Sequence, residues 1–328
     1  MKLSVLNLLP IRQGGDFVSS VQEMKRLAKH VENLKFERFW IAEHHNTKTF
    51  GSSSTQLLVQ EALASTESIR VGAGGVMLPN HSPYLVAEQY GTLAALNPER
   101  VDLGIGRAPG TDMATAHALR REKMGMEQSF VSDIGELIGY FKGTNAVHAY
   151  PAEGRDVPMY ILGSSETSAY FAARLGLPYG FAAHFAPAKM EEAIKTYRDN
   201  FQKSEFLEEP YVILGVNVVM ADDQSEAERL ATTQLGVLID IVTGVQDGLR
   251  PPLSNADEVW SKIAESRVKA EKAPHFGPVA FEASEIIDSE KEIVESMSEV
   301  SLIGDKQHVK EQFQDLLKRV SFDELMAV

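Results

Sequence analysis

The residues best suited to acid–base or metal chemistry are Glu43, His44 and His45, which end a predicted strand over residues 38–45. Successive side chains of a strand point to opposite faces, so a regular strand keeps His44 and His45 out of one shared site. A metal-binding pair on one face calls for His-x-His spacing, which makes metal catalysis the weakest interpretation. Two interpretations stay open: both histidines are hydrogen-bonded structural residues, or one of them donates or accepts a proton in a reaction.

A second group of residues is typical of phosphate binding. Gly104 and Gly106 leave space along another predicted strand, and Arg107 at its end suits a bidentate contact with phosphate. The run 163–168 (GSSETS) leads into a helix, whose free N–H groups favour an anion. A plain serine N-cap with nothing bound explains this run equally well when it is taken alone. Together with Arg107, and with Arg120-Arg121 downstream, it predicts a site for one phosphate, as in a mononucleotide or flavin mononucleotide (FMN).

The elements that must position these residues alternate between short apolar runs and amphipathic helices. The first four predicted strands begin near residues 3, 38, 70 and 101, a spacing of roughly 30 residues that is typical of one βα unit. In total we predict strands over residues 3–8, 38–45, 70–77, 101–108, 159–163, 180–185, 212–221 and 324–328. The predicted helices cover residues 17–34, 55–66, 83–96, 166–175, 187–203 and 306–320, with one more from residue 224.

This alternation predicts an α/β fold, a (β/α)8 TIM barrel, rather than a doubly wound sheet. The dinucleotide fingerprint of the rival fold fails because Pro109 stands where its third glycine belongs. We expect a single domain over residues 1–328, with insertions after the fourth and seventh strands at roughly 109–158 and 236–299. The acidic segment 282–299 is expected to be a solvated helix. A barrel needs a helix after its eighth strand, so we expect the natural chain to continue beyond Val328.

In such a barrel the active site lies at the C-terminal ends of the strands. Those ends carry Glu43 to His45, Asn80-His81, Arg107, the run 163–165 and His184-Phe185. Histidines therefore gather at the same end of the predicted barrel as the phosphate-binding groups.

Composition excludes several other classes of protein. The 328 residues contain 32 Lys+Arg and 46 Asp+Glu, a net charge of −14 that disfavours binding to nucleic acid or to an anionic membrane surface. The absence of cysteine rules out disulfide scaffolds, thiolate metal sites and cysteine nucleophiles. Neither a signal peptide nor an apolar run of membrane-spanning length is recognisable, so a cytoplasmic location is expected.

Four segments carry a resemblance to a known family: RFWIAEHHN, IRVGAGGVMLPNHSPYLVAEQYGTLAAL, NPERVDLGIGRAPGTD and GSSETSAYFAARLGLPYGFAAHFAP. Together they resemble the bacterial luciferase-like flavin monooxygenases, nearest to the single-chain branch that is similar to the luciferase α subunit, and the resemblance extends over nearly the whole chain. It implies a TIM barrel that binds reduced FMN delivered by a separate flavin reductase. It further implies that oxygen adds at the flavin C4a position, that the peroxyflavin oxidises a small organic substrate, and that the chain forms a homodimer.

The same resemblance assigns roles to particular residues. The histidine beside the isoalloxazine corresponds to His44, and a non-proline cis peptide beside the flavin corresponds to Gly74-Gly75. The phosphate-binding residues correspond to Arg107, Ser164, Ser165 and Ser168, with Arg121 as a second cation. The family's phosphate-loop glutamate is replaced here by Ser164, and the cysteine near the luciferase flavin by Gly106, so light emission is not expected.

Two other functions stay open at this stage. One is a flavin-binding protein without turnover, which the presence of His44 disfavours. The other is a dehydrogenase that uses the deazaflavin F420, since some barrels of this superfamily bind that cofactor. No residue pattern specifies whether the substrate is an aldehyde, a sulfonate or another organic group.

Overall fold

The computed structural model describes residues 1–108, 111, 113–119, 126–244, 248–271, 275–276, 279–280 and 282–328, with the backbone alone described at 113, 126–129, 275–276 and 279–280. Arg121, the predicted second phosphate-binding cation, lies outside these residues. Within them, none of the helices combines the length and apolar character needed to cross a membrane.

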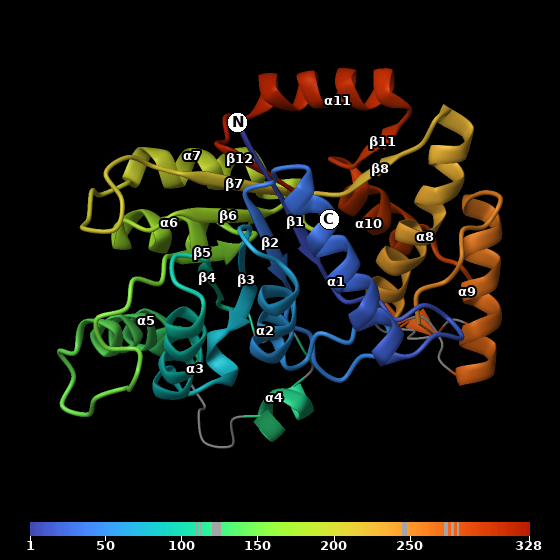
Figure 1. Ribbon diagram of the computed structural model, residues 1–328. Coiled ribbons are helices and arrows are strands. Elements are labelled where there is room, and N and C mark those ends of the chain that lie inside the picture. Colours follow the sequence, from blue (N-terminus) through green and yellow to red (C-terminus); the bar gives the residue numbers. More distant parts are fainter. Residues whose placement is uncertain are drawn as a thin grey trace.

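Eight parallel strands close into a barrel, which confirms the predicted (β/α)8 fold (Figure 1). Each strand pairs with the next in the order β1, β2, β3, β4, β5, β6, β7, β12 and back to β1. The chain's last strand therefore closes the barrel, with Leu3 opposite Leu325. The strands are β1 (Lys2–Asn7), β2 (Arg38–Ile41), β3 (Arg70–Met77), β4 (Val101–Gly106), β5 (Met159–Gly163), β6 (Tyr179–Ala182), β7 (Val212–Val216) and β12 (Glu324–Ala327).

Helices surround the barrel and cover its outer surface (Figure 1). The first illustrates why these segments fold as they do. Asp16 caps its N-terminus by accepting a hydrogen bond from the Ser19 N–H, and Met24, Ala28 and Val31 recur at helical spacing and are buried. The barrel helices are α1 (Phe17–Asn33), α2 (Thr55–Ser65), α3 (Pro83–Leu96), α5 (Met126–Lys142), α6 (Glu166–Leu175), α7 (Met190–Asn200) and α11 (Lys306–Arg319), and the shorter ones are α4 (Met113–Leu119), η1 (Leu78–Asn80) and η2 (Pro187–Lys189).

Three predicted strands differ most from the structure. The second ends at Ile41 instead of residue 45, and the sixth ends at Ala182 instead of residue 185. Both corrections put histidines in the segments that follow the strands. The predicted seventh strand divides at Asn217 into β7 and β8 (Val218–Met220), and β8 leaves the barrel to pair with β11 (Leu302–Gly304).

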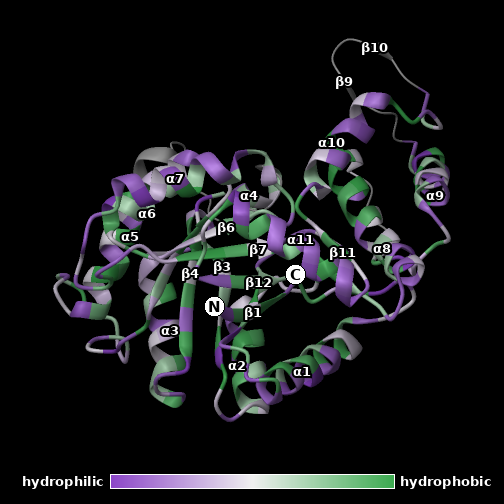
Figure 2. Ribbon diagram, turned by 90° about the horizontal axis from the view of Figure 1, so that it is seen from above, coloured by the Kyte–Doolittle hydropathy of each residue, from purple (hydrophilic) through white to green (hydrophobic). Residues whose placement is uncertain are grey.

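The stretch after β8 forms a group of helices on one side of the barrel (Figure 2). It contains α8 (Gln224–Thr243), α9 (Ala256–Ala270), α10 (Asp288–Ser298) and a two-stranded ladder of β9 (His275–Phe276) and β10 (Val279–Ala280). The expectation that the acidic segment is entirely solvated is wrong at Glu290. That carboxylate is buried and forms an ion pair with Arg267 of α9, which is also buried. Glu290 therefore links α10 to α9.

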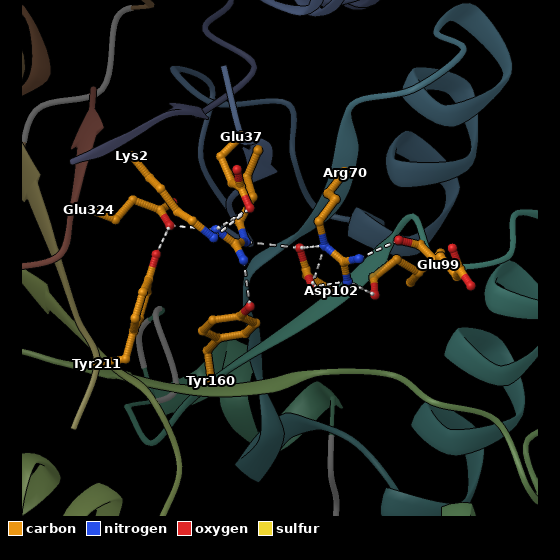
Figure 3. A network of polar contacts seen from close by, with 10 residues as sticks. Lys2, Glu37, Arg70, Glu99, Asp102, Tyr160, Tyr211 and Glu324 are labelled. Atoms are coloured by element: carbon orange, nitrogen blue, oxygen red, sulfur yellow. Dashed lines mark hydrogen bonds and ion pairs between the residues drawn. The ribbon is translucent and has the colours of Figure 1, made fainter. Parts of the chain in front are cut away.

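The barrel interior is built in layers by side chains that alternate along each strand. Its middle layer is apolar and includes Leu6, Trp40, Tyr160, Ile213 and Met326. Below it, at the N-terminal ends of the strands, lies a buried network of charged and phenolic groups (Figure 3).

Arg38 is the centre of this network. Its guanidinium donates to Asp102 at 3.1 Å, to Tyr160 at 3.0 Å and to Glu324. Glu324 also accepts from Tyr211 at 2.7 Å. Burial acts to lower the pKa of Arg38, but the surrounding acidic groups outweigh it and raise that pKa above its ordinary value. The lower end of the barrel is thus closed by a fixed ion cluster, which leaves the opposite end for chemistry.

Candidate active site at the barrel mouth

His44 lies at the C-terminal end of the barrel, three residues beyond β2. Its backbone N–H donates to the Ser52 carbonyl at 3.2 Å, and its ring packs 5.0 Å from that of Phe50. The Nδ1 atom is buried and has no hydrogen-bond partner among the described residues. Burial lowers the pKa of His44 to about 4, although the charge of Glu43 acts in the opposite direction. The imidazole is therefore neutral at neutral pH and can accept a proton.

Its neighbour His45 belongs to a different cluster, centred on Glu43. The Glu43 Oε1 atom lies 2.8 Å from His45 Nε2 and 2.7 Å from His81 Nε2, and Oε2 accepts the Met77 N–H at 3.2 Å. Burial acts to raise the pKa of Glu43, but the hydrogen bonds from the two histidines outweigh it and bring the pKa to about 2. Glu43, His45 and His81 are residue types that bind zinc, and their ligand atoms lie within 4.8 Å of one another. The carboxylate is already satisfied by hydrogen bonds to the two histidines.

The Glu43 cluster provides a first test of the structure. Glu43→Gln keeps the shape of the side chain but removes the charge that both imidazoles contact, and we expect a loss of about 1.5–3 kcal/mol in the free energy of unfolding at pH 7. Folding lowers the pKa of Glu43. The contribution of Glu43 to the free energy of unfolding is therefore fully present above pH 4.5, its ordinary pKa, and declines as the pH falls towards 2. Urea titrations at several pH values measure both effects.

Glu61 is the matched control for this test, because its carboxylate pairs with Lys25 at 2.7 Å on the exposed surface. Glu61→Gln is expected to cost less than 1 kcal/mol. Equal losses in the two variants would show that the Glu43 cluster adds nothing beyond an ordinary surface pair.

The predicted phosphate-binding residues meet at the ends of two neighbouring strands. Gly106 of β4 is paired with Leu162 of β5, so Arg107 and Ser164, which follow these strands, lie at the same edge. No carboxylate of the described residues forms an ion pair with Arg107. Burial raises the pKa of Tyr179, whose hydroxyl donates to the Ser165 carbonyl at 3.2 Å, and the positive charge of Arg107 acts against that rise. The pairing of β4 with β5 puts Arg107 and the turn that begins α6 at the same end of the barrel.

The serines of that turn have different surroundings. Ser165 is the N-cap of α6, and its hydroxyl accepts the Ser168 N–H at 3.3 Å. Ser168 is buried, and its own hydroxyl donates to the Ser165 carbonyl at 2.7 Å and contacts the Tyr179 hydroxyl at 3.0 Å. Ser168 thus shapes the turn from beneath, whereas Ser164 and Ser165 are only partly buried and stand closer to any anion bound at the helix N-terminus.

Gly74 and Gly75 lie in an irregular part of β3, between the pairs that Ala73 and Val76 make with β4. The bond between them is cis, as the family resemblance implied. A Cβ on Gly75 would be 2.6 Å from the Gly104 carbonyl oxygen, so these strands approach each other too closely for any side chain there. The side chains of Leu6, Trp40 and Leu162 also pack against these two glycines.

Three residues of the mouth were not assigned a role from the sequence: Glu43, His81 and His184. Each was visible as a polar residue at a predicted strand end, and His81 and Glu43 come from different strands. Only the fold shows that they touch, because a single sequence contains no signal that pairs residues 38 positions apart. His184 follows β6, which ends at Ala182, at the same end of the barrel.

The residue types at this end of the barrel suit the parts of FMN. A phosphate requires a cation and free N–H groups, which Arg107 and the start of α6 supply. A flat ring system requires apolar neighbours and a polar contact. Leu6, Trp40 and Leu162 pack against the glycines of β3 and β4, and His44 has a buried Nδ1 without a partner in the described chain. The residue types at this end of the barrel are thus those that a flavin mononucleotide would need.

Comparisons with known proteins show which family the chain matches. A family model described as luciferase-like monooxygenase matches residues 1–324. A luciferase-like monooxygenase of Escherichia coli (strain K12) is 37% identical over 326 residues, covering 98% of this chain and 90% of that protein. N-acetyl-S-alkylcysteine monooxygenase of Bacillus subtilis (strain 168) is 36% identical over 208 residues, covering 61% of this chain and 62% of that protein.

Solved structures give the same fold. The crystal structure of apo-MsnO8 has a TM-score of 0.80 and 30% identity, covering 100% of this chain and 92% of that one. Two more distant structures show the fold alone. The oxygenating component of 3,6-diketocamphane monooxygenase from Pseudomonas putida, in complex with FMN, has a TM-score of 0.65 at 15% identity and coverage of 100% and 91%. An F420-dependent secondary alcohol dehydrogenase has a TM-score of 0.66 at 12% identity and coverage of 99% and 92%.

Proposed function

Because this chain belongs to the luciferase-like monooxygenase family, we propose that it uses reduced FMN and dioxygen to oxidise a small organic substrate. Reduced FMN, when bound, activates dioxygen at its C4a position and supplies one oxygen atom to the substrate, while the other leaves as water. The observation that carries the proposal is that Arg107 and the α6 N-terminus follow two paired strands, β4 and β5, at the end of the barrel where His44 follows β2.

In this proposal different residues of the chain bind the phosphate, support the flavin ring and hold a proton. Arg107, Ser164 and Ser165 hold the phosphate, and Ser168 fixes the turn that presents its N–H groups. The backbone at Gly74 and Gly75 supports the flavin ring. His44 holds or accepts a proton at Nδ1, the ring atom that has no partner in the described chain.

The second candidate is a dehydrogenase that uses F420, because a barrel of the same fold is solved with that cofactor. FMN is favoured by the monooxygenase names of the closer relatives. The two functions differ in their need for oxygen, since hydride transfer to or from F420 proceeds without dioxygen. Fluorescence titration of the protein with FMN and with F420, followed by turnover with and without oxygen, separates them.

The proposal includes partners. A separate flavin reductase supplies reduced FMN in the cytoplasm by transient contact, and the working form is a homodimer. Oxygen uptake with chemically reduced FMN, compared with uptake in the presence of a flavin reductase and NAD(P)H, tests the delivery step.

The phosphate site is tested by Arg107→Ala. Losing a charge-assisted contact to phosphate is expected to weaken FMN binding by about 2 kcal/mol, or roughly thirtyfold in Kd. Flavin fluorescence titration measures the change. Arg26→Ala, which removes an exposed arginine on α1, is the matched control and is expected to leave the affinity unchanged. Equal affinity in the two variants would remove Arg107 from the site.

A further inference from the structure

Glu43, His45 and His81 bring three metal-ligating side chains together beside the barrel mouth. Oε1 of Glu43 lies 2.8 Å from Nε2 of His45 and 2.7 Å from Nε2 of His81, and these ligand atoms are all within 4.8 Å of one another. In the part of the chain that the structure describes, this is the one group of three or more acidic or histidine side chains that converge in this way. The sequence argument against a metal, that adjacent histidines point to opposite faces, does not apply, because the second imidazole comes from His81 and not from His44.

The backbone holds these ligands in place independently of their mutual contacts. Glu43 and His45 follow β2, whereas His81 follows β3 and η1, and the pairing of β2 with β3 brings the two segments side by side. The His81 N–H donates to the Leu78 carbonyl at 3.0 Å, and the Met77 N–H donates to Oε2 of Glu43 at 3.2 Å. Oε2 is thus attached to the backbone while Oε1 faces the histidines. A donor set that is already ordered loses little conformational entropy when it binds an ion.

The exposure of the three side chains gives an ion access to the cluster. The Glu43 side chain is 2% exposed, that of His45 11% and that of His81 26%. The negative charge therefore lies where the effective dielectric constant is low and its attraction for a cation is strong. The ring centroids of His45 and His81 are 6.5 Å apart, so the two rings approach the carboxylate without stacking on each other. An ion and its water reach Glu43 from the His81 side.

The donor types restrict which ion fits. Two imidazole nitrogens and one carboxylate oxygen are the ligands of zinc sites that keep a fourth position for water. Calcium and magnesium prefer oxygen ligands. Zinc bonds of about 2.0–2.1 Å in tetrahedral geometry put neighbouring ligand atoms roughly 3.3 Å apart. Each imidazole therefore has to move away from Glu43 by about 0.5 Å from its hydrogen-bonded position, a shift that the two partly exposed rings can make.

We propose that Glu43, His45 and His81 bind one zinc ion, with a water molecule as the fourth ligand. Without zinc, the two Nε2–H groups donate to Oε1 of Glu43. With zinc, each neutral imidazole carries its proton on Nδ1 and gives its Nε2 lone pair to the ion. The ion joins the segments that follow β2 and β3 and stabilises this end of the barrel. The assignment is independent of the proposed function, since it requires neither FMN nor an organic substrate.

The test measures zinc binding to the full chain after treatment with EDTA and removal of the chelator. Calorimetric titration with ZnCl2 is expected to give one ion per chain, and zinc is expected to raise the melting temperature. Cobalt(II) is the spectroscopic probe, because its visible absorption reports tetrahedral coordination. His81→Ala removes one of the three protein ligands and is expected to weaken zinc binding by about a hundredfold or more.

Two further variants separate ligand loss from unfolding and from binding elsewhere. His81→Asn can still donate a hydrogen bond to Glu43, which protects the fold, but it lacks the imidazole, so we expect the same loss of zinc affinity as in His81→Ala. His308→Ala is the matched control, because His308 pairs with Asp305 at 3.0 Å on the exposed surface. Its zinc affinity is expected to equal that of the parent.

The outcomes decide the assignment without reference to the flavin. A loss of zinc affinity in His81→Asn, with His308→Ala unchanged, supports it. A parent protein without saturable binding of one zinc ion per chain overturns it. Equal zinc affinity in the parent and in His81→Asn also overturns it, because zinc would then be bound by other histidines.

Discussion

His44→Ala is expected to bind FMN almost normally and to oxidise substrate about a hundredfold more slowly, or slower still. The reason is that His44 is a neutral imidazole with a buried, unpartnered Nδ1 at the mouth, and a positioned acid or base contributes about 10²–10⁴-fold to rate. Its pKa of about 4 adds a pH signature. Because the folded pKa is lowered, the neutral form persists from neutral pH down to about 4 and is lost as the pH falls further. Substrate-dependent oxygen uptake and flavin titration give the two quantities.

His45→Ala is the control for this experiment, since the His45 ring is hydrogen-bonded to Glu43, whereas His44 has a buried Nδ1 without a partner in the described chain. This variant is expected to lower the melting temperature while activity per folded molecule is retained. If His45→Ala abolishes turnover and His44→Ala does not, the assignment of the catalytic histidine is wrong.

Arg38→Met is expected to produce the largest loss of stability, about 3–5 kcal/mol in the free energy of unfolding. The substitution fills similar volume but leaves Asp102 and Glu324 buried without the guanidinium that neutralises both. In this variant Asp102 still forms its ion pair with Arg70, and Glu324 still accepts the hydrogen bond from Tyr211. We therefore expect a destabilised protein that still folds. Urea denaturation at pH 7 measures the change.

Arg12→Met is the matched control, because Arg12 pairs with Glu23 on the exposed surface. An exposed pair contributes less than about 1 kcal/mol. If Arg38→Met costs no more than Arg12→Met, the buried network of Figure 3 does not hold the lower end of the barrel together.

The barrel itself was predictable from the sequence, because apolar strands and amphipathic helices alternate along the chain at the spacing of βα units. This alternation can be recognised in one sequence without an alignment. The ends of the strands were not. RFWIAEHH reads as one continuous strand, but pairing with β1 and β3 stops at Ile41. The short pair of β8 and β11 was missed for a similar reason, since two three-residue strands 84 positions apart have no local signal.

The site was predictable in part. Arg107, the α6 turn and His44 are signalled by residue types at the ends of predicted strands, and the structure puts all three at the same end of the barrel. Glu43 and His81 could not be joined from the sequence, because their contact depends on how β2 and β3 lie side by side. Ser168 was expected among the phosphate ligands, and it stays a prediction. The structure adds that Ser165 and Ser168 form the capping box of α6, a role that a sequence match cannot distinguish from ligand binding.

The central claim is that this mouth transfers one atom of dioxygen from reduced FMN to an organic substrate. Mass spectrometry of the product formed under ¹⁸O2, with reduced FMN as the only electron donor, tests it most directly. We predict that each product molecule contains one ¹⁸O atom, and that Arg107→Ala lowers the yield when FMN is limiting. A product without ¹⁸O, or turnover that proceeds with F420 in the absence of oxygen, would contradict the account.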